Sequence, residues 1–302
     1  AMLTASNPDN NDEFGASVAV HGSVIAIGAP SEDAADSSDT AIAADSGAVY
    51  LFRHDGSTWL EEKYLKGPTP AEYDNFGAAV SLSNGLVAVA APSRDNSVPD
   101  HGAVYIYSNT GADWTQTCLL FPAINSVTAQ DKLMFGSQVS LHGTTLAASG
   151  YFEDNFSSEN AGGVYLYEDA TNCSQPGLRI EASNASGGDR FGAAISLYED
   201  VLVVGAPWED SNSSGIDGAQ DPATSPNAGA AYFFTRGASG WSQYNFIKAS
   251  NPDGNDRFGA SVALSGDSLA IGAFREGSDA TGTDGDQQSN DSSNSGAIYI
   301  FR

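Results

Sequence analysis

DEFGASVAVHGSVIAIGAP, residues 12–30, returns in altered form four more times along the chain. The copies are marked by a Phe-Gly pair, which begins at Phe14, Phe76, Phe135, Phe191 and Phe258. Neighbouring copies lie roughly sixty residues apart, a period that predicts a propeller or a solenoid. The chain is therefore expected to consist of one supersecondary unit repeated five times.

Each copy reads as strand, turn, strand, loop, strand, turn and strand. In the first copy the first strand is FGASVAV, and the second, VIAIGAP, is apolar at nearly every position, which is typical of a strand buried on both faces. The third, GAVYLF, is rich in residues that favour strands, and the looser TWLEEKYLKG suits an outer edge. This pattern predicts an all-β fold, a β-propeller of five four-stranded blades.

The predicted blades lie within a single domain of residues 1–302 and span about residues 14–67, 76–123, 135–182, 191–249 and 258–302. The last copy ends after its third strand, at Ile298–Arg302. Residues 3–9, LTASNPD, match residues 247–253, IKASNPD, which end a fourth strand. We expect residues 2–6 to complete the last blade and close the ring, which would remove an exposed sheet edge. The alternative is a piece of a longer array with further blades.

The motifs resemble the FG-GAP repeats of integrin α-subunit heads and their bacterial relatives. Copies one and four carry the full pair, as Phe14-Gly15 with Gly28-Ala29-Pro30 and Phe191-Gly192 with Gly205-Ala206-Pro207. Integrin heads have seven blades, however, and several of those blades carry a calcium loop of the form DxDxDGxxD between the first two strands. Here that connection is a tight turn such as His21-Gly22, so the family's calcium sites do not carry over. The resemblance implies an extracellular or cell-surface module that binds a ligand.

The net charge of the chain indicates which classes of partner it can bind. The chain has 38 acidic and 12 basic residues and a net charge of −26. In a propeller, the loops between strands two and three share a face with the loops that lead to the next first strand, and these two kinds of loop hold most of the acids. Such a face repels nucleic acid and anionic membranes and attracts cations or basic surfaces, or it serves only for solubility. No apolar run is long enough to insert into a membrane.

Acidic residues recur at fixed positions of the repeat. An Asp stands two residues before Phe in four copies, and a Glu-Asp pair follows the Gly-Ala-Pro position in three. Such regular recurrence favours a structural role in turns, and calcium held between the loops is the alternative. Irregular loops add further calcium candidates, namely Asp279, Asp284 and Asp286, with Asp217 and Asp221 in the preceding copy.

Side chains that break the repeat are better candidates for ligand contact than those that keep it. Trp208, Phe152 and Arg275 follow the Gly-Ala-Pro position, where the other copies carry serine. These three could instead only cover the ends of their blades. The predicted ligand-binding set is Trp208, Phe152, Arg275, Arg94, Glu209 and Asp210.

Catalysis is not expected. Glycoside hydrolysis needs two acids in different environments at one bond, whereas the inner strands carry no acid and the loop acids repeat from blade to blade. The four histidines match no catalytic triad or metal motif. Whether Cys118 and Cys173 pair is left open.

The sequence thus predicts an extracellular ligand-binding or adhesion module, a monomeric domain of a larger surface protein, that recognises a protein, peptide or glycan. The acidic loop face would provide the binding surface, with possible help from calcium. A polysaccharide-active enzyme of propeller fold and a purely structural spacer are the alternatives.

Overall fold

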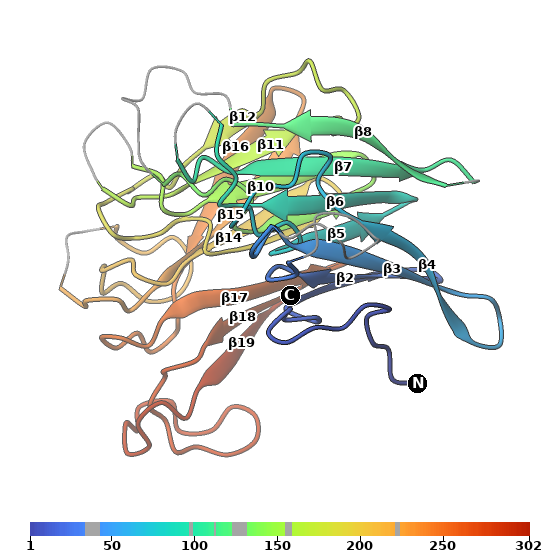
Figure 1. Ribbon diagram of the computed structural model, residues 1–302. Coiled ribbons are helices and arrows are strands. Elements are labelled where there is room, and N and C mark those ends of the chain that lie inside the picture. Colours follow the sequence, from blue (N-terminus) through green and yellow to red (C-terminus); the bar gives the residue numbers. More distant parts are fainter. Residues whose placement is uncertain (34–42, 97–98, 112, 123–131, 155–158, 221–223) are drawn as a thin grey trace. The chain divides into compact units, whose positions relative to one another are not determined.

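The fold consists of strands alone in the part of the chain that the structure describes. The computed structural model describes residues 1–33, 43–96, 99–111, 113–122, 132–154, 159–220 and 224–302. Within these ranges the chain forms five antiparallel sheets and no helix, so no helix there could span a membrane. The predicted all-β fold, a β-propeller with five blades, is confirmed (Figure 1).

Each repeat forms one sheet, and the strands follow one another in chain order. The first sheet contains β1 (Ser17–His21), β2 (Val24–Ala29), β3 (Ala48–His54) and β4 (Trp59–Leu65). The second contains β5 (Val80–Ser83), β6 (Leu86–Ala91), β7 (Ala103–Asn109) and β8 (Trp114–Leu120). The third contains β9 (Val139–His142), β10 (Thr145–Gly150), β11 (Gly163–Tyr167) and β12 (Leu178–Ile180). The fourth contains β13 (Ala194–Tyr198), β14 (Val201–Ala206), β15 (Ala230–Gly237) and β16 (Gly240–Ile247), and the fifth β17 (Phe258–Ser265), β18 (Ser268–Ala273) and β19 (Ala297–Phe301).

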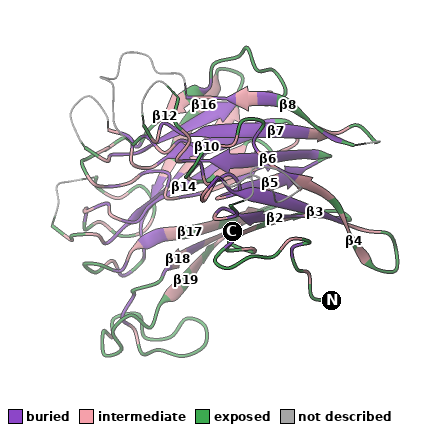
Figure 2. Ribbon diagram, in the orientation of Figure 1, coloured by how far each residue is buried: buried purple, intermediate pink, exposed green. Residues whose placement is uncertain are grey.

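The second strand is almost entirely buried in the first four sheets, as its continuous apolar sequence predicts, whereas β18 in the fifth sheet alternates between buried and partly buried residues. All six residues of β6 and of β10 are buried, whereas the outer strand β4 alternates between exposed and partly buried residues (Figure 2). Strands three and four of the first, second and fourth sheets also contain a register shift. A shift of this kind locally increases the twist of the outer strand.

The contacts divide the chain into two compact units. Unit 1 comprises Ala1–Gly150 and Tyr165–Arg179, and unit 2 comprises Tyr151–Val164 and Ile180–Arg302. Within unit 1 the first strands lie side by side, β1 next to β5 and β5 next to β9, and within unit 2 β13 lies next to β17. Serine hydroxyls on these strands reinforce the contact, since Ser81 Oγ accepts a hydrogen bond from the N–H of Leu141.

The Phe-Gly pair explains how one repeat is joined to the next. Each Phe packs against the tyrosine of the third strand in its own copy, as Phe76 does against Tyr105 with ring centroids 5.2 Å apart. The following Gly77 has a φ of +96°, and a Cβ there would lie 2.4 Å from the carbonyl oxygen of Ala48 in the previous sheet. Only glycine fits such a backbone conformation and so close an approach.

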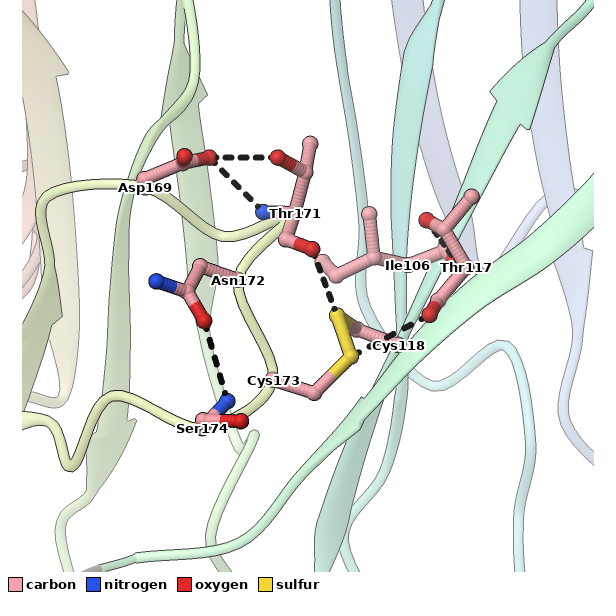
Figure 3. Close-up of a disulfide and its surroundings, with 8 residues drawn as sticks. All are labelled: Ile106, Thr117, Cys118, Asp169, Thr171, Asn172, Cys173 and Ser174. Carbon is pink, nitrogen blue, oxygen red and sulfur yellow. Dashed lines mark hydrogen bonds between the residues drawn. A yellow bond between two sulfur atoms is a disulfide. The ribbon is translucent and has the colours of Figure 1, made fainter.

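Cys118 and Cys173 form a disulfide, which settles the question that the sequence left open. Cys118 lies on β8, Cys173 lies in the loop after β11, and their Cα atoms are 5.3 Å apart (Figure 3). The sulfur atoms also lie 3.1 Å from the carbonyl oxygens of Thr171 and Thr117. The loop therefore runs along the outer strand of the second sheet, a placement that the repeat pattern does not reveal.

The closing strand is not confirmed. The sheet of β17, β18 and β19 has three strands in the described residues, and residues 2–6 form no strand. The amino-terminal segment does contact the first sheet, because Asn7 Oδ1 accepts a hydrogen bond from the hydroxyl of Tyr50. Asn184 and Asn251 make the same contact with Tyr232 and Tyr299. Residues around Asn7 therefore pack as the linkers between blades do.

Candidate functional site

The two kinds of loop on the predicted binding face are hydrogen-bonded to each other. The N–H of Asn75 donates to the carbonyl of Asp45, and the next N–H donates to the carbonyl of Ser46. Three further pairs repeat this contact, namely Met134 with Asp100, Arg190 with Asn160 and Arg257 with Asn227. In the first four sheets, the loop between strands two and three therefore lies at the same end of its blade as the loop that leads to the next blade, as predicted.

The Asp two residues before Phe in four of the copies has a structural role. Asp12, Asp74, Asp189 and Asp256 are buried, and each accepts the N–H of the residue three positions earlier. Burial raises the pKa of Asp189 to about 7 and that of Asp256 to about 6, because desolvation disfavours the charged carboxylate. The recurrent Asp therefore closes the turn that precedes the Phe-Gly pair in these four copies.

The Glu of the Glu-Asp pair is also buried and bound. Glu209 Oε2 accepts a hydrogen bond from Lys248 Nζ at 2.7 Å, and Glu209 Oε1 accepts one from Asn184 Nδ2 at 3.0 Å. The side chains of Lys248 and Glu209 are only 0% and 3% exposed. Glu209, a predicted ligand residue, is thus a buried side chain that bonds to other residues of the protein.

The Asp of the pair holds the loop that follows it. The N–H of Asn227, a residue with a φ of +55°, donates to Asp210 Oδ1 at 2.7 Å. Three other carboxylates accept the N–H of a left-handed residue in the same way, namely Asp33 from Asp45, Asp95 from Asp100 and Asp154 from Asn160. Asp210 therefore has a structural partner as well as a position near the loop surface.

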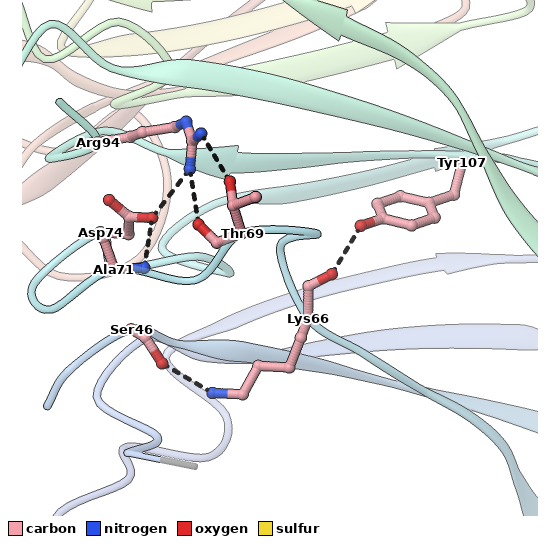
Figure 4. A network of polar contacts seen from close by, with 7 residues as sticks. All are labelled: Ser46, Lys66, Thr69, Ala71, Asp74, Arg94 and Tyr107. Atoms are coloured by element: carbon pink, nitrogen blue, oxygen red, sulfur yellow. Dashed lines mark hydrogen bonds and ion pairs between the residues drawn. The ribbon is translucent and has the colours of Figure 1, made fainter. Parts of the chain in front are cut away.

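Arg94 replaces the buried Glu in the second copy. Arg94 Nη1 donates to Asp74 Oδ2 at 3.1 Å, and Arg94 Nη2 donates to Thr69 Oγ1 at 3.1 Å (Figure 4). The guanidinium also lies 5.7 Å from the ring centroid of Tyr105. Directly after β4, Lys66 Nζ donates to Ser46 Oγ at 3.0 Å. Arg94, a predicted ligand residue, thus stabilises the loop that contains Thr69 and Asp74.

Unit 2 gathers Phe152, Arg190, Trp208 and Arg257, and Arg275 lies near enough for its charge to act on Arg257; we call these five residues the arginine–aromatic cluster. The Cζ atoms of Arg190 and Arg257 lie 4.3 Å and 4.4 Å from the ring centroid of Trp208. Arg190 Cζ also lies 5.0 Å from the ring centroid of Phe152. Two aromatic residues from different loops are therefore joined by arginines that stack on them, an arrangement with cation–π character.

The charge of Arg257 is poorly compensated. Burial, followed by the positive charges of Arg275 and Arg190, lowers the pKa of Arg257, and Asp210 opposes this shift. The Nε and Nη1 atoms of Arg257 are buried and have no hydrogen-bond partner among the described residues. Arginine stays charged in proteins. A negatively charged group that accepted hydrogen bonds from Arg257 would therefore stabilise this site.

The predicted calcium candidates remain separate in the described part of the chain. Asp217 accepts hydrogen bonds from Asn245 Nδ2 and from the N–H of Phe246, and Asp279 accepts one from Ser289 Oγ. The N–H of Gln288 donates to Asp286 Oδ1, Asp284 has a φ of +53°, and Asp221 lies outside the described residues. Among the described residues no group of three or more His, Cys, Asp or Glu side chains could hold a metal ion.

Two residues of the cluster were not among the predicted ligand residues. Arg190 and Arg257 stand directly before Phe in their copies, where the other copies carry Glu, Asn or Met. Both break the repeat, as Trp208 does, so the criterion that selected Trp208 would have selected them as well. The sequence alone does not show that a residue before Phe and a residue after Gly-Ala-Pro meet on one surface.

Comparison with known families agrees with this architecture. The sequence model described as FG-GAP repeat matches residues 1–52, 59–107, 178–234 and 241–301. The third sheet, whose copy reads Ser149-Gly150-Tyr151 in place of Gly-Ala-Pro, lies mostly between these matches. No curated protein matches the chain. Because the four matches cover more than half of the sequence, the chain belongs to the FG-GAP repeat family.

Proposed function

We propose that this chain is an extracellular ligand-binding or adhesion module that recognises a protein, peptide or glycan through its loops. The observation that carries the proposal is the arginine–aromatic cluster, in which residues that break the repeat come together within unit 2. The recurrent loop acids, in contrast, bind backbone groups of their own blades. A rigid scaffold that presents irregular loop residues is the usual design of a binding module.

The family and the disulfide support an extracellular or cell-surface location. FG-GAP repeats are typical of such proteins, and the chain matches this family four times. Disulfides persist mainly in oxidising compartments, and Cys118 and Cys173 form one here. The module would act as a domain of a larger surface protein.

The test is capture on a glycan and peptide array, run with calcium and with a chelator. Specific capture that disappears in the Arg190→Ala/Arg257→Ala variant would support binding through the cluster. If no ligand is captured although the protein is folded, the spacer alternative is favoured and the proposal fails.

Calcium and catalysis are separate parts of the proposal. We propose that calcium binds to the exposed loop that carries Asp279, Asp284 and Asp286, although the described residues there form no preformed group of three metal ligands, and that the module catalyses no reaction. A rise in melting temperature with calcium that is lost in Asp284→Asn would support the first point. Release of reducing ends from a polysaccharide panel would contradict the second.

A further inference from the structure

The arginine–aromatic cluster differs from the other basic residues of the chain in its partners. Several basic side chains elsewhere lie next to carboxylates, namely Arg53 by Glu62, Lys63 by Asp113, Arg94 by Asp74, Arg236 by Asp200 and Lys248 by Glu209. In the described residues no carboxylate lies within 4.0 Å of the guanidinium of Arg190, Arg257 or Arg275. In a chain with 38 acids this absence is unexpected, because a nearby carboxylate would stabilise the arginines.

The arrangement costs free energy when the site is empty. Like charges gather in a partly buried place, and two donors of Arg257 meet no acceptor among the described residues. An unpaired donor in a low-dielectric environment is costly, whereas an oxyanion that enters the cluster would supply the acceptors and compensate the charge. Stacking on Trp208 also holds the guanidiniums in place, which reduces the entropy lost when a ligand binds.

We propose that the arginine–aromatic cluster binds the carboxylate or sulfate groups of an acidic polysaccharide. This inference rests on the proposed function and names the class of ligand. A planar guanidinium can donate two parallel hydrogen bonds to either oxyanion. Arg190 and Arg257 both contact the ring of Trp208, so a polymer with a charge on each sugar could engage both.

The neighbourhood favours a glycan over an acidic peptide. Peptide and protein ligands draw much of their affinity from apolar side chains that fill pockets. Two pockets of the described residues, one beside β19 and one beside β8, include no member of the cluster. The ring of Trp208 is already in contact with guanidiniums, and the adjacent half-buried Asn227 and exposed Asn255 carry amides that can bond sugar hydroxyls.

The experiment titrates the full chain with four polymers of similar length, namely oligogalacturonate, dextran sulfate, uncharged dextran and polyglutamate. Binding is measured by calorimetry and by the ¹H–¹⁵N signal of the Trp208 indole. We expect the two acidic polysaccharides to bind and to shift this signal, and dextran to do neither. Comparison of the two acidic polysaccharides distinguishes a carboxylate from a sulfate ligand.

Variants test the named residues. Arg190→Ala and Arg257→Ala should each weaken binding about tenfold or more, the loss expected for a charge-assisted hydrogen bond. Arg236→Ala is the matched control, because Arg236 also lies over a tryptophan in unit 2, Trp241, but has Asp200 as its partner. Binding by Arg236→Ala should equal that of the wild type. If a cluster variant fails to fold, the indole shift of the wild type still decides the question.

Three results would overturn the inference. The first is that neither acidic polysaccharide binds or shifts the Trp208 signal. The second is that Arg236→Ala loses as much affinity as the cluster variants, and the third is that polyglutamate binds more tightly than both polysaccharides. A neutral ligand captured on the array, with no effect of Arg257→Ala, would contradict this inference and leave the proposed binding function standing.

Discussion

Single buried carboxylates make the stability of this protein depend on pH. Burial raises the pKa of Asp189 to about 7, well above that of an exposed aspartate, because the carboxylate loses its hydration inside the turn. Below about pH 4 both the folded and the unfolded chain hold this proton, so burial is not penalised. As the pH rises toward 7, the unfolded chain releases the proton first, and the free energy of unfolding falls by at most about 1.4 kcal/mol per pH unit.

Asp189→Asn should therefore become more stable relative to the wild type between pH 4 and 7. Asparagine can still accept the N–H of Ser186 without bearing a charge. The measurement is urea denaturation of both proteins at several pH values. Asp55→Asn is the control, because hydrogen bonds from the N–H groups of Thr58 and Ser57 lower the pKa of the exposed Asp55 to about 2. A constant difference between Asp189→Asn and the wild type from pH 4 to 8 would contradict the prediction.

The ion pair of Lys248 and Glu209 provides a second prediction at the residue scale. Both groups are buried, so Lys248→Met leaves a carboxylate without its partner and should lower the free energy of unfolding by roughly 3–5 kcal/mol. The double variant Lys248→Met/Glu209→Gln removes both charges and should regain most of that loss. Denaturant unfolding of the wild type, Lys248→Met, Glu209→Gln and the double variant gives the coupling free energy between the two side chains. Strictly additive losses would show that the pair is not coupled.

At the scale of secondary-structure elements, the disulfide joins the loop after β11 to β8. The two cysteines are 55 residues apart, and a cross-link of this span restricts the unfolded chain by roughly 4 kcal/mol. Cys118→Ala/Cys173→Ala should therefore unfold at a lower denaturant concentration than the wild type. A reductant should lower the midpoint of the wild type and leave that of the variant unchanged. Equal midpoints without reductant would show that the bond adds no stability.

Strands were predictable from the sequence because their signals are local and repeated five times. The second strand is apolar because its own blade buries it. The residue after each Phe is glycine because the backbone of the neighbouring blade comes close to it. The disulfide was not predictable, because the repeat pattern does not show where the irregular loop around Cys173 runs. The arginine–aromatic cluster was only half predictable, since its members come from loops of different copies that meet only after folding.

At the scale of the whole molecule, the first and last sheets carry apolar residues that the middle sheets bury. Val18 and Val20 on β1 are 61% and 66% exposed, and Ile298 and Ile300 on β19 are 72% and 59% exposed. The residues equivalent to these in the second sheet are buried, namely Val80, Leu82, Val104 and Ile106. Phe14 is likewise only partly buried, whereas the Phe of every other Phe-Gly pair is buried. Exposed apolar surface of this extent on each of the two sheets is typical of a surface that binds another part of the protein or a partner.

Ring closure makes a prediction about register. Leu3 matches Ile247 in the repeat, and Ile247 pairs with Ala231, which is the equivalent of Ile298 in the last copy. If residues 2–6 complete the last sheet, Leu3 lies opposite Ile298. Leu3→Cys/Ile298→Cys should then form a disulfide within one chain under mild oxidation, whereas Leu3→Cys/Ile300→Cys, two residues out of register, should not. Peptide mapping locates the bond beside the native one. A bond between two chains would show that the strand is exchanged between copies, and no bond in either variant would contradict closure by this segment.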